Sequence, residues 1–435
     1  MAQPPQQRIS DGSRVLRQRA GAVKVHCVAQ EPADLRDTNA ERNIRLATGT
    51  LIFLVPGFFG FTSAGALSYF HDVERALGKA LARRGVDARI VRCRTQPTAS
   101  IPRRADSLRQ QVVEHGGLEA RELHFVGHST GGLDVRMLLT PGVRISTDDS
   151  EVRIAERTRS AISVATPHYG TPLANHFMTV QGHTLLLIMS ALATSSPARA
   201  ATVAAAKLLG SVTGLDTGLG RAATTLPRAA TGLLEALRLS RGDGLWRYLE
   251  EISRDQGAVL QLTPEGTNLF DAAVTDRDGV AYGCVVAGVR RPRTALTAKA
   301  LLDPGDAALQ ALFRLLYALT ERQHPRYPYP KPRKAIQRRL DREFGFAATA
   351  STNDGVVPTL SQLHGRLVHV ARADHLDVVG HFTQANSTSN WLPSGAGFTV
   401  QAFERTWSAV AAAIARSSRA PGGKPAARRE ARKAR

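Results

Sequence analysis

The stretch LHFVGHSTGGLDVRMLL, which runs from Leu123 to Leu139, places Ser129 between glycines where an apolar run gives way to a helical pattern. Small residues in this arrangement are typical of a tight turn, and they also let a serine hydroxyl stand clear of the backbone. A strand, a G-x-S-x-G turn and a helix in this order form the context in which such a serine is a nucleophile. A plain strand-to-helix turn is the alternative reading of the same residues.

Short apolar runs alternate with helical patterns on both sides of this stretch. Strands are predicted at 51–55, 87–95, 123–126, 159–167, 279–289 and 365–371, and helices at 69–85, 103–117 and 133–138. The first of these helices has apolar residues at helical spacing and a glycine at its end. Strands that alternate with helices of this length predict an α/β fold, with a mostly parallel central sheet and helices on both faces.

Two long segments interrupt this alternation, at about 173–250 and about 290–346. The first is rich in Ala, Leu, Thr and Gly and is typical of several inserted helices. The second carries a helical pattern at 306–319 and a loop of Pro, Tyr and basic residues at 322–334. We expect both to be insertions in one domain that spans 45–415, and we expect them to form a helical cap over Ser129.

Both ends of the chain are polar. Residues 1–44 are rich in Gln and Arg, and residues 416–435 are basic with almost no large apolar side chain. Such compositions bury too little apolar surface to offset chain entropy, so we expect a weakly ordered N-terminal segment and a disordered basic tail. The formal net charge of +20 raises the question of nucleic acid or an anionic membrane as a partner. Base-reading motifs are absent, so we expect no specific nucleic-acid binding.

The composition suits a large globular domain. The chain has 435 residues, of which 43% are hydrophobic, so a sizeable core is possible. Cys27, Cys93 and Cys284 are too few for a disulfide framework, and none has a metal-type spacing. The first residues, MAQPPQQRISDGSR, lack the apolar segment of a secretory signal, and no apolar run approaches the ~20 residues that span a bilayer. We therefore expect a soluble, cytoplasmic protein.

A nucleophilic serine needs a base, and the base needs an orienting carboxylate. The best acid is Asp354 in the tight loop NDGVVP, although an ordinary turn would use the same residues. The best base is His375, which follows the predicted strand 365–371. The competing bases are His364 and His369, which lie on that strand, and His381, which lies farther from its end. The competing acids are Asp374 and Asp377, which flank His375 too closely to reach its ring.

Acyl transfer also needs N–H donors for the oxyanion that develops. One is expected from the backbone of Thr130, directly after the nucleophile. The second is expected from the loop VPGFFGF, where Phe58 offers an N–H and a ring that lines the acyl pocket. Phe59 and His128, beside these donors in the chain, are the candidate substrate-binding residues. A glycine turn with core phenylalanines is the alternative for this loop.

With these motifs the chain resembles the bacterial triacylglycerol lipases and esterases of the α/β-hydrolase superfamily. LVPGFFGF is similar to the strand and oxyanion loop of that family, VGHSTGG to its nucleophile elbow and ATPHYGTPLA to its segment after the next strand. NDGVVP and DHLDVVGHF are similar to its acid and histidine motifs, and the resemblance covers about 51–174 and 350–382. The resemblance implies that Ser129 is the nucleophile, that His375 is the general base and acid, and that Asp354 is the orienting carboxylate. It also implies that Phe58 and Thr130 are the two oxyanion donors.

The resemblance also implies a structural calcium ion, with Asp377 as one ligand, and no other cofactor. A charged loop residue is the alternative for Asp377. The chain departs from the family at Pro56, where a histidine usually precedes the oxyanion glycine. It also lacks the secretory signal and the disulfide pair of the family.

The expected function is that of a serine-dependent carboxylic ester hydrolase, a lipase or esterase that works through an acyl-enzyme. Its substrate would be a small-molecule or lipid ester, and apolar faces of the cap could bind an acyl chain or contact a lipid surface. Two alternatives remain. The same triad could transfer acyl groups or depolymerise an intracellular polyester, or the chain could be a non-catalytic binding protein that uses its basic tail. Candidates for all three triad positions argue against the last alternative.

Overall fold

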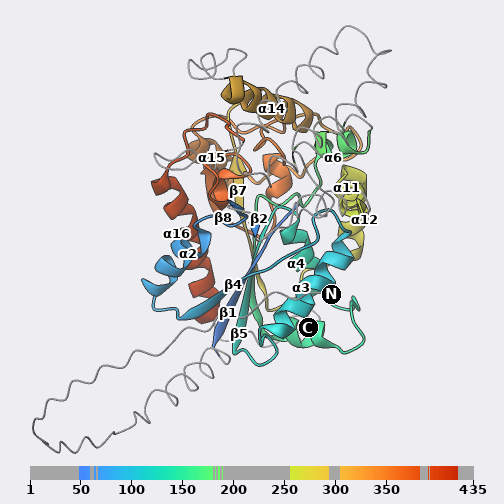
Figure 1. The fold of residues 1–435 in the computed structure, drawn as a ribbon, viewed down its shortest axis with the longest axis vertical. Helices are drawn as coiled ribbons and strands as arrows, with labels where there is room; N and C mark the ends of the chain where they lie inside the picture. Colours follow the sequence, from blue (N-terminus) through green and yellow to red (C-terminus); the bar gives the residue numbers. More distant parts are fainter. Residues whose placement is uncertain are drawn as a thin grey trace, which may run out of the picture. The chain divides into compact units, whose positions relative to one another are not determined.

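Six parallel strands form the centre of the fold (Figure 1). They are β1 (Thr50–Val55), β4 (Ala88–Arg92), β5 (Glu122–His128), β6 (Thr158–Val164), β7 (Ala281–Gly288) and β8 (Arg366–Arg372). Their order in the sheet is β4-β1-β5-β6-β7-β8, and every neighbouring pair is parallel. The predicted α/β class and parallel sheet are therefore confirmed. The carboxyl ends of all six strands meet at one edge, where such sheets bind ligands.

The computed structural model describes residues 49–58, 63–64, 67–179, 182, 185–186, 189, 255–292, 304–382, 390 and 392–419. All of them belong to the larger of two units, Ile44–Arg435. Five predictions fall partly or wholly outside the described residues: the N-terminal segment 1–44, Phe59, most of the insertion 173–250, residues 293–303 of the insertion 290–346 and the tail beyond Arg419. Within the described ranges, no helix combines the length and apolar character needed to cross a membrane.

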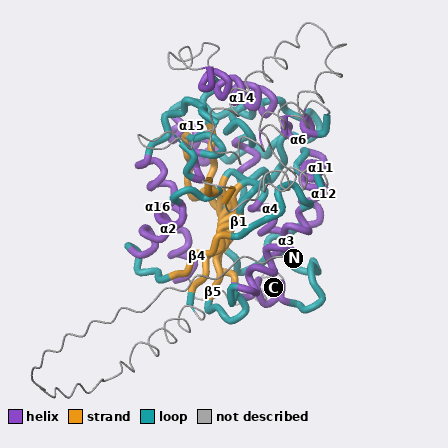
Figure 2. Tube along the Cα trace, viewed as in Figure 1, coloured by secondary structure: helices purple, strands orange, loops and turns teal. Residues whose placement is uncertain are grey.

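Helices cover both faces of the sheet (Figure 1 and Figure 2). One face carries α2 (Val73–Ala82) and α16 (Val400–Arg419), which pack against each other. The other face carries α3 (Ile101–Glu114), α4 (Gly131–Leu139) and α5 (Ser150–Arg157). The sheet is thus the middle of three layers, as the alternation of patterns predicts.

Strand β1 shows why the central strands are continuous apolar runs. Ile52 and Leu54 point into a buried cluster that includes Trp407 of α16, whereas Leu51 and Phe53 point into a second cluster with α3 and α4. Successive side chains of a strand face opposite sides, so both alternating sets are buried. Burial of one such side chain stabilises the fold by about 1.5–3 kcal/mol.

Shorter elements connect the strands. A small hairpin, β2 (Ser63–Ala64) and β3 (Leu67–Ser68), follows β1. The described part of the long segment before β7 contains α6 (Pro172–Phe177), α11 (Gly257–Gln261) and α12 (Pro264–Ala273). Between β7 and β8 lie α14 (Pro304–Thr320), α15 (Lys334–Phe344) and the short 3-10 helix η2 (Thr359–Gln362). A second 3-10 helix, η3 (Asp377–Val379), follows β8.

The insertion 290–346 differs in part from the predicted cap. Leu340 and Phe344 of α15 share a buried cluster with Leu367 and Val370 of β8. This amphipathic helix buries its apolar face against the sheet, so it belongs to the helical layer. Phe313 of α14 shares a buried cluster with Leu173 and Phe177 of α6, and these two helices pack against each other. Within this insertion, α15 is therefore part of the layer on the sheet, whereas a role of α14 in the cap stays a prediction.

The predicted boundary of the C-terminal tail is wrong by four residues, because α16 continues through Arg419. Trp407, Val410 and Ile414 of this helix are fully buried at helical spacing. Near its end the Ser418 hydroxyl lies 3.1 Å from Nε2 of His124 in β5. Burial of one face against the sheet carries the helix beyond the point where the composition becomes basic.

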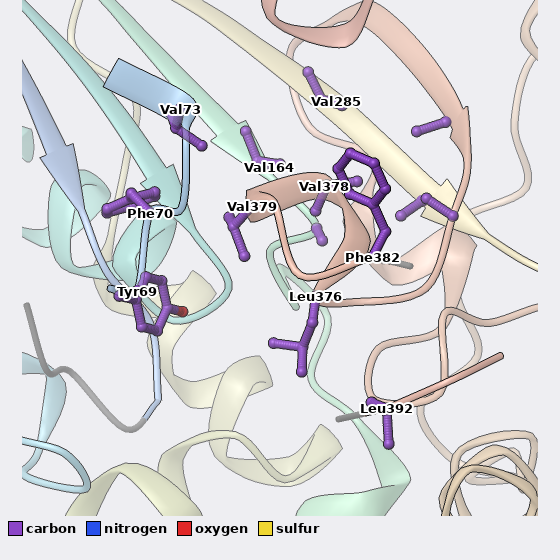
Figure 3. Packing of buried hydrophobic residues seen from close by; sticks show 14 of the residues in the cluster. Tyr69, Phe70, Val73, Val164, Val285, Leu376, Val378, Val379, Phe382 and Leu392 are labelled. Carbon is purple, nitrogen blue, oxygen red and sulfur yellow. The ribbon is translucent and has the colours of Figure 1, made fainter. Parts of the chain in front are cut away.

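The segment after β8 is anchored in the core by its apolar side chains. Figure 3 shows Val378, Val379 and Phe382 gathered near Val164 and Val285 of the sheet. The Trp407 indole also donates a 3.0 Å hydrogen bond to the carbonyl of Val378. This packing fixes the position of the residues that come directly before it.

Candidate active site

Ser129 occupies a strained turn between β5 and α4. Its φ is 53°, in the left-handed region that non-glycine residues rarely adopt. Its backbone N–H donates a 2.9 Å hydrogen bond to the carbonyl of Val164, which holds the turn against β6. A left-handed non-glycine residue costs about 1–3 kcal/mol and is concentrated at functional sites. The turn places the serine at the carboxyl edge of the sheet.

The glycines around Ser129 are required by close backbone contacts. A Cβ atom at Gly127 would lie 2.5 Å from backbone atoms of Gly131 and Gly132. A Cβ atom at Gly131 would collide with the carbonyl of Val55. The G-x-S-x-G pattern thus lets the start of α4 cross directly over the end of β5.

Asp354 lies in the tight loop before η2, and four hydrogen bonds hold its carboxylate. Oδ1 accepts from the backbone N–H groups of Val356 and Val357 at 2.9 and 2.7 Å. Oδ2 accepts from the Gln362 amide at 3.1 Å and from Nδ1 of His375 at 2.8 Å. A fully buried carboxylate with this many donors is held in one orientation.

His375 is held through both its ring and its backbone. Because the Asp354 carboxylate accepts from Nδ1, that nitrogen carries the proton, and Nε2 of the neutral ring has a free electron pair. The His375 N–H donates a 3.0 Å bond to the Asp354 carbonyl. Its own carbonyl lies 3.0 Å from Nε2 of His128. The ring is therefore presented in the tautomer that a general base requires.

Ser129 and His375 line one cavity, part of which is open to solvent. Its walls also include apolar side chains from α6, from α11 and from the segments near 356, 376 and 392: Leu173, Phe177, Met189, Val259, Leu262, Val356, Leu376 and Leu392. Within the described chain, no hydrogen bond joins the Ser129 hydroxyl to His375. Such contacts often tighten only when substrate binds. The structure thus places Ser129 and His375 on one cavity, with Asp354 bonded to Nδ1 of the His375 ring.

The two predicted oxyanion donors lie on either side of Ser129. Thr130 precedes α4, and in the described part of the chain its backbone N–H has no hydrogen-bond acceptor. Phe58 lines the cavity next to Ser129. N–H groups at a helix start carry partial positive charge, which favours an anion at this place. The predicted substrate contact of Phe59 lies outside the described residues.

Arg104 is a residue of this site that the motifs do not reveal. It lies on α3, is fully buried, and binds both carboxylate oxygens of Asp134 in α4 through Nε at 3.1 Å. Its Nη2 also donates to the carbonyls of Pro56 and Gly57 at 2.9 and 3.2 Å. One guanidinium therefore ties the loop before Phe58 to the helix after Ser129. A readable signal exists, because Arg104 falls on the apolar face of a predicted helix.

Two opposing influences act on the pKa of Asp134 in this buried pair. Burial raises the pKa of Asp134 to about 6, while the neighbouring Arg104 lowers it. Both side chains are completely shielded from water. Removal of one partner would leave an uncompensated buried charge, which is strongly destabilising. The pair therefore fixes the loop firmly only as long as both members remain.

His128 does not have the predicted role of a substrate contact. Its ring is buried, with Nδ1 2.7 Å from the Tyr69 hydroxyl and Nε2 3.0 Å from the His375 carbonyl. It is also absent from the described lining of the cavity. The reason is geometric: the residue before a left-handed serine ends the buried strand, so its side chain points behind the cavity wall. Tyr69, its partner, is a second residue that the motifs did not identify.

Asp377 was predicted as a calcium ligand. It forms a buried pair with Asp374, and Asp377 Oδ2 accepts the Asp374 N–H at 3.0 Å. Burial raises the pKa of Asp374 to about 6, and burial followed by the charge of Asp374 raises the pKa of Asp377. No third acidic, histidine or cysteine side chain joins them among the described residues. Ca²⁺ also takes backbone carbonyl, amide and water oxygens as ligands, so calcium binding at Asp377 stays a prediction.

Comparison with known proteins gives similarity in fold only. No family model and no curated protein matches the chain. Among solved structures, the metagenomic carboxyl esterase MGS0156 is 18% identical, with 85% of this chain and 76% of that chain covered and a TM-score of 0.46. Lipase 1 from Pelosinus fermentans is 17% identical over 80% of this chain and 97% of that chain, with a TM-score of 0.45. The Staphylococcus hyicus lipase is 15% identical over 86% and 97%, with a TM-score of 0.44.

Bacterial lipases and esterases are thus among the solved structures that this chain resembles. The identities are too low to assign a role to any residue. The roles of the residues in the candidate active site rest on the geometry of this chain alone.

Proposed function

We propose that this chain is a serine-dependent carboxylic ester hydrolase, an esterase or lipase. The observation that carries the proposal is the shared cavity of Ser129 and His375, with Asp354 bonded to the far nitrogen of the His375 ring. A nucleophile, a base and an orienting carboxylate in this relation are the working parts of acyl transfer by a serine. The strained turn at Ser129 supports the same assignment.

The reaction follows from these positions. The Ser129 hydroxyl attacks the ester carbonyl carbon, and its proton passes to Nε2 of His375. The N–H groups of Thr130 and Phe58 stabilise the negative charge on the carbonyl oxygen. The carbonyl re-forms as the C–O bond to the alcohol breaks, and His375 returns the proton to the departing oxygen. Water then attacks the acyl-enzyme by the same route and releases the carboxylic acid.

The cavity favours an uncharged, apolar acyl group. Its described lining contains no Asp, Glu, Lys or Arg side chain. Phe177, Met189 and Val259 offer aliphatic and aromatic surface, and each CH₂ group buried there contributes about 0.8 kcal/mol to binding. Esters of aliphatic acids, either small molecules or lipids, are the substrates that this lining would accept. A lipid surface is then a natural place for such an enzyme to meet its substrate.

The apolar lining also supports a second candidate, in which an alcohol rather than water takes the acyl group. Acyl transfer and polyester depolymerisation would use the same Ser129, His375 and Asp354. Hydrolysis is the first proposal because water needs no dedicated binding site for an acceptor.

The test is a hydrolysis profile over p-nitrophenyl esters from acetate to palmitate, with Ser129→Ala as the control. We expect turnover by the wild type and none by the variant. The same reactions run with a primary alcohol separate the two candidates, because a transferase would form the new ester in preference to free acid. Equal turnover by Ser129→Ala and the wild type would contradict both.

A further inference from the structure

At the cavity, three hydrogen bonds connect the oxyanion loop to the backbone of the base, through Tyr69 in the cavity lining and the buried His128. The Gly57 N–H donates to the Tyr69 hydroxyl at 2.8 Å. The Tyr69 hydroxyl lies 2.7 Å from Nδ1 of His128, and Nε2 of His128 lies 3.0 Å from the His375 carbonyl. Tyr69 and His128 are both buried, so these bonds do not compete with bulk water.

The direction of each bond is determined by its end groups. A carbonyl only accepts, so Nε2 of His128 carries the proton. Burial and the nearby His375 lower the pKa of His128 well below its usual value, so its ring is neutral and Nδ1 accepts. Tyr69 therefore donates its proton to Nδ1 and accepts from Gly57 with its oxygen. Only one arrangement of protons satisfies all three bonds.

These bonds fix the orientation of the peptide between Gly57 and Phe58. The N–H of Gly57 is used by Tyr69, and the carbonyl of Gly57 accepts from Arg104. A trans peptide directs its N–H away from its carbonyl, so the N–H of Phe58 points away from Arg104. A Cβ atom at Gly57 would collide with Ser129, so this loop lies directly against the nucleophile.

We propose that Tyr69 and His128 are positioning residues that hold the oxyanion peptide of Phe58 and the base His375 in one geometry about Ser129. This inference rests on the proposed function of the same site. The chain of bonds begins at the loop that supplies the oxyanion donor and ends at the backbone of the base. A displacement of about 1 Å in such a site costs about a hundredfold in rate. Loss of the chain therefore acts on the chemical step more than on substrate binding.

The matched pair of variants is Tyr69→Phe and Tyr282→Phe. Each variant removes a tyrosine hydroxyl that accepts a hydrogen bond from a backbone N–H. Tyr69 accepts from Gly57, and Tyr282, near the start of β7, accepts from Arg277 at 3.1 Å. We expect Tyr69→Phe to lower kcat by about ten- to a hundredfold with little change in KM. Tyr282→Phe should keep both constants within about twofold of the wild type, whatever its melting temperature.

His128 allows a rescue experiment. His128→Gln keeps one donor and one acceptor near the positions of the ring nitrogens, whereas His128→Leu keeps neither. We expect Gln to retain most of kcat and Leu to lose it to the same extent as Tyr69→Phe. Equal kcat in the wild type, Tyr69→Phe and His128→Leu would overturn the proposal, as would equal losses in Tyr69→Phe and Tyr282→Phe.

A measurement without substrate separates this proposal from the proposed function. In protein with ¹⁵N-labelled histidine, the signals of His128, assigned by their loss in His128→Gln, report its tautomer. We expect a neutral ring protonated at Nε2 at pH 7. A ring protonated at Nδ1 or at both nitrogens would overturn the bond chain, whether or not the protein hydrolyses esters. An inactive wild type with the expected tautomer would instead contradict the proposed function alone.

Discussion

Among the described residues a serine lies near a histidine in several places, and two of them show what a catalytic pair requires. At the candidate active site, His375 receives its orientation from Asp354 and shares a cavity with Ser129. In the second place, His168 lies 3.0 Å from the hydroxyl of Ser163. Ser163 and His168 are within hydrogen-bond distance, whereas no hydrogen bond joins the Ser129 hydroxyl to His375 in the described part of the chain. Proximity alone therefore does not identify a nucleophile.

The difference lies in the partner of the far ring nitrogen. Nδ1 of His168 lies 3.5 Å from Nη1 of Arg136, which only donates hydrogen bonds. Nδ1 of His168 is thus an acceptor, so Nε2 carries the proton and donates to Ser163. The Ser163 hydroxyl in turn donates to the Gly283 carbonyl at 3.3 Å. His168 therefore cannot take a proton from Ser163, whereas Nε2 of His375 can take one from Ser129.

The largest expected effect separates the two serines. Ser129→Ala should lower kcat/KM for a p-nitrophenyl ester by at least about a thousandfold, because the acyl-enzyme cannot form. Ser163→Ala should leave kcat/KM within about twofold of the wild type, since that hydroxyl bonds to His168 and to the Gly283 carbonyl and is not part of the described lining of the Ser129 cavity. Steady-state kinetics on both purified variants checks this. A large loss in Ser163→Ala, with its fold intact by circular dichroism, would break the comparison.

The next effect separates Asp354 from Asp276, another carboxylate that bonds to a histidine. Asp354→Asn should lower kcat by about ten-thousandfold, because an amide favours the wrong tautomer of His375. Asp276 bonds to His364 at 3.0 Å in the second place, so Asp276→Asn is the matched control and should keep its activity. Comparable kcat values for the two variants would show that the Asp354 contact is structural.

The smallest expected effect is on stability. Burial and the nearby His364 lower the pKa of His168 well below its usual value. Below about pH 6.5 the unfolded chain binds a proton at this histidine and the folded chain does not, so acid lowers the free energy of unfolding. For one such histidine the loss is roughly 2 kcal/mol between pH 7 and pH 5. His168→Asn should remove that share of the pH dependence.

Urea unfolding of the wild type and His168→Asn at pH 7 and pH 5 measures this share. His128 is also held neutral by burial, so the variant should retain a part of the wild-type dependence. An identical change in both proteins would mean that His168 is charged in the fold.

The sequence reveals the parts of this site that lie in short motifs. The strand, the turn at Ser129 and the helix are adjacent in the chain, and Asp354 and His375 follow late strands in tight loops. These features depend on local backbone geometry, which leaves a pattern in a single sequence. The parallel sheet was predictable for the same reason.

The contacts that join distant segments leave no such pattern. Tyr69 and His128 are 59 residues apart, and Arg104 and Pro56 are 48 residues apart. Their pairing depends on how loops and helices meet at the sheet edge, so the sequence placed His128 against substrate and left Tyr69 and Arg104 unassigned. Helix α16 is a different case, because its buried face repeats at helical spacing and was predictable, as was the burial of Arg104 on the apolar face of α3.

The most direct test of the central claim is covalent labelling with a fluorophosphonate, followed by peptide mass spectrometry. The probe forms a stable bond with a serine only where a base and an oxyanion site activate it. We predict labelling of Ser129 in the wild type and in Ser163→Ala, and no labelling in Ser129→Ala. A wild-type protein that stays unlabelled, or one labelled at Ser163, would contradict the account.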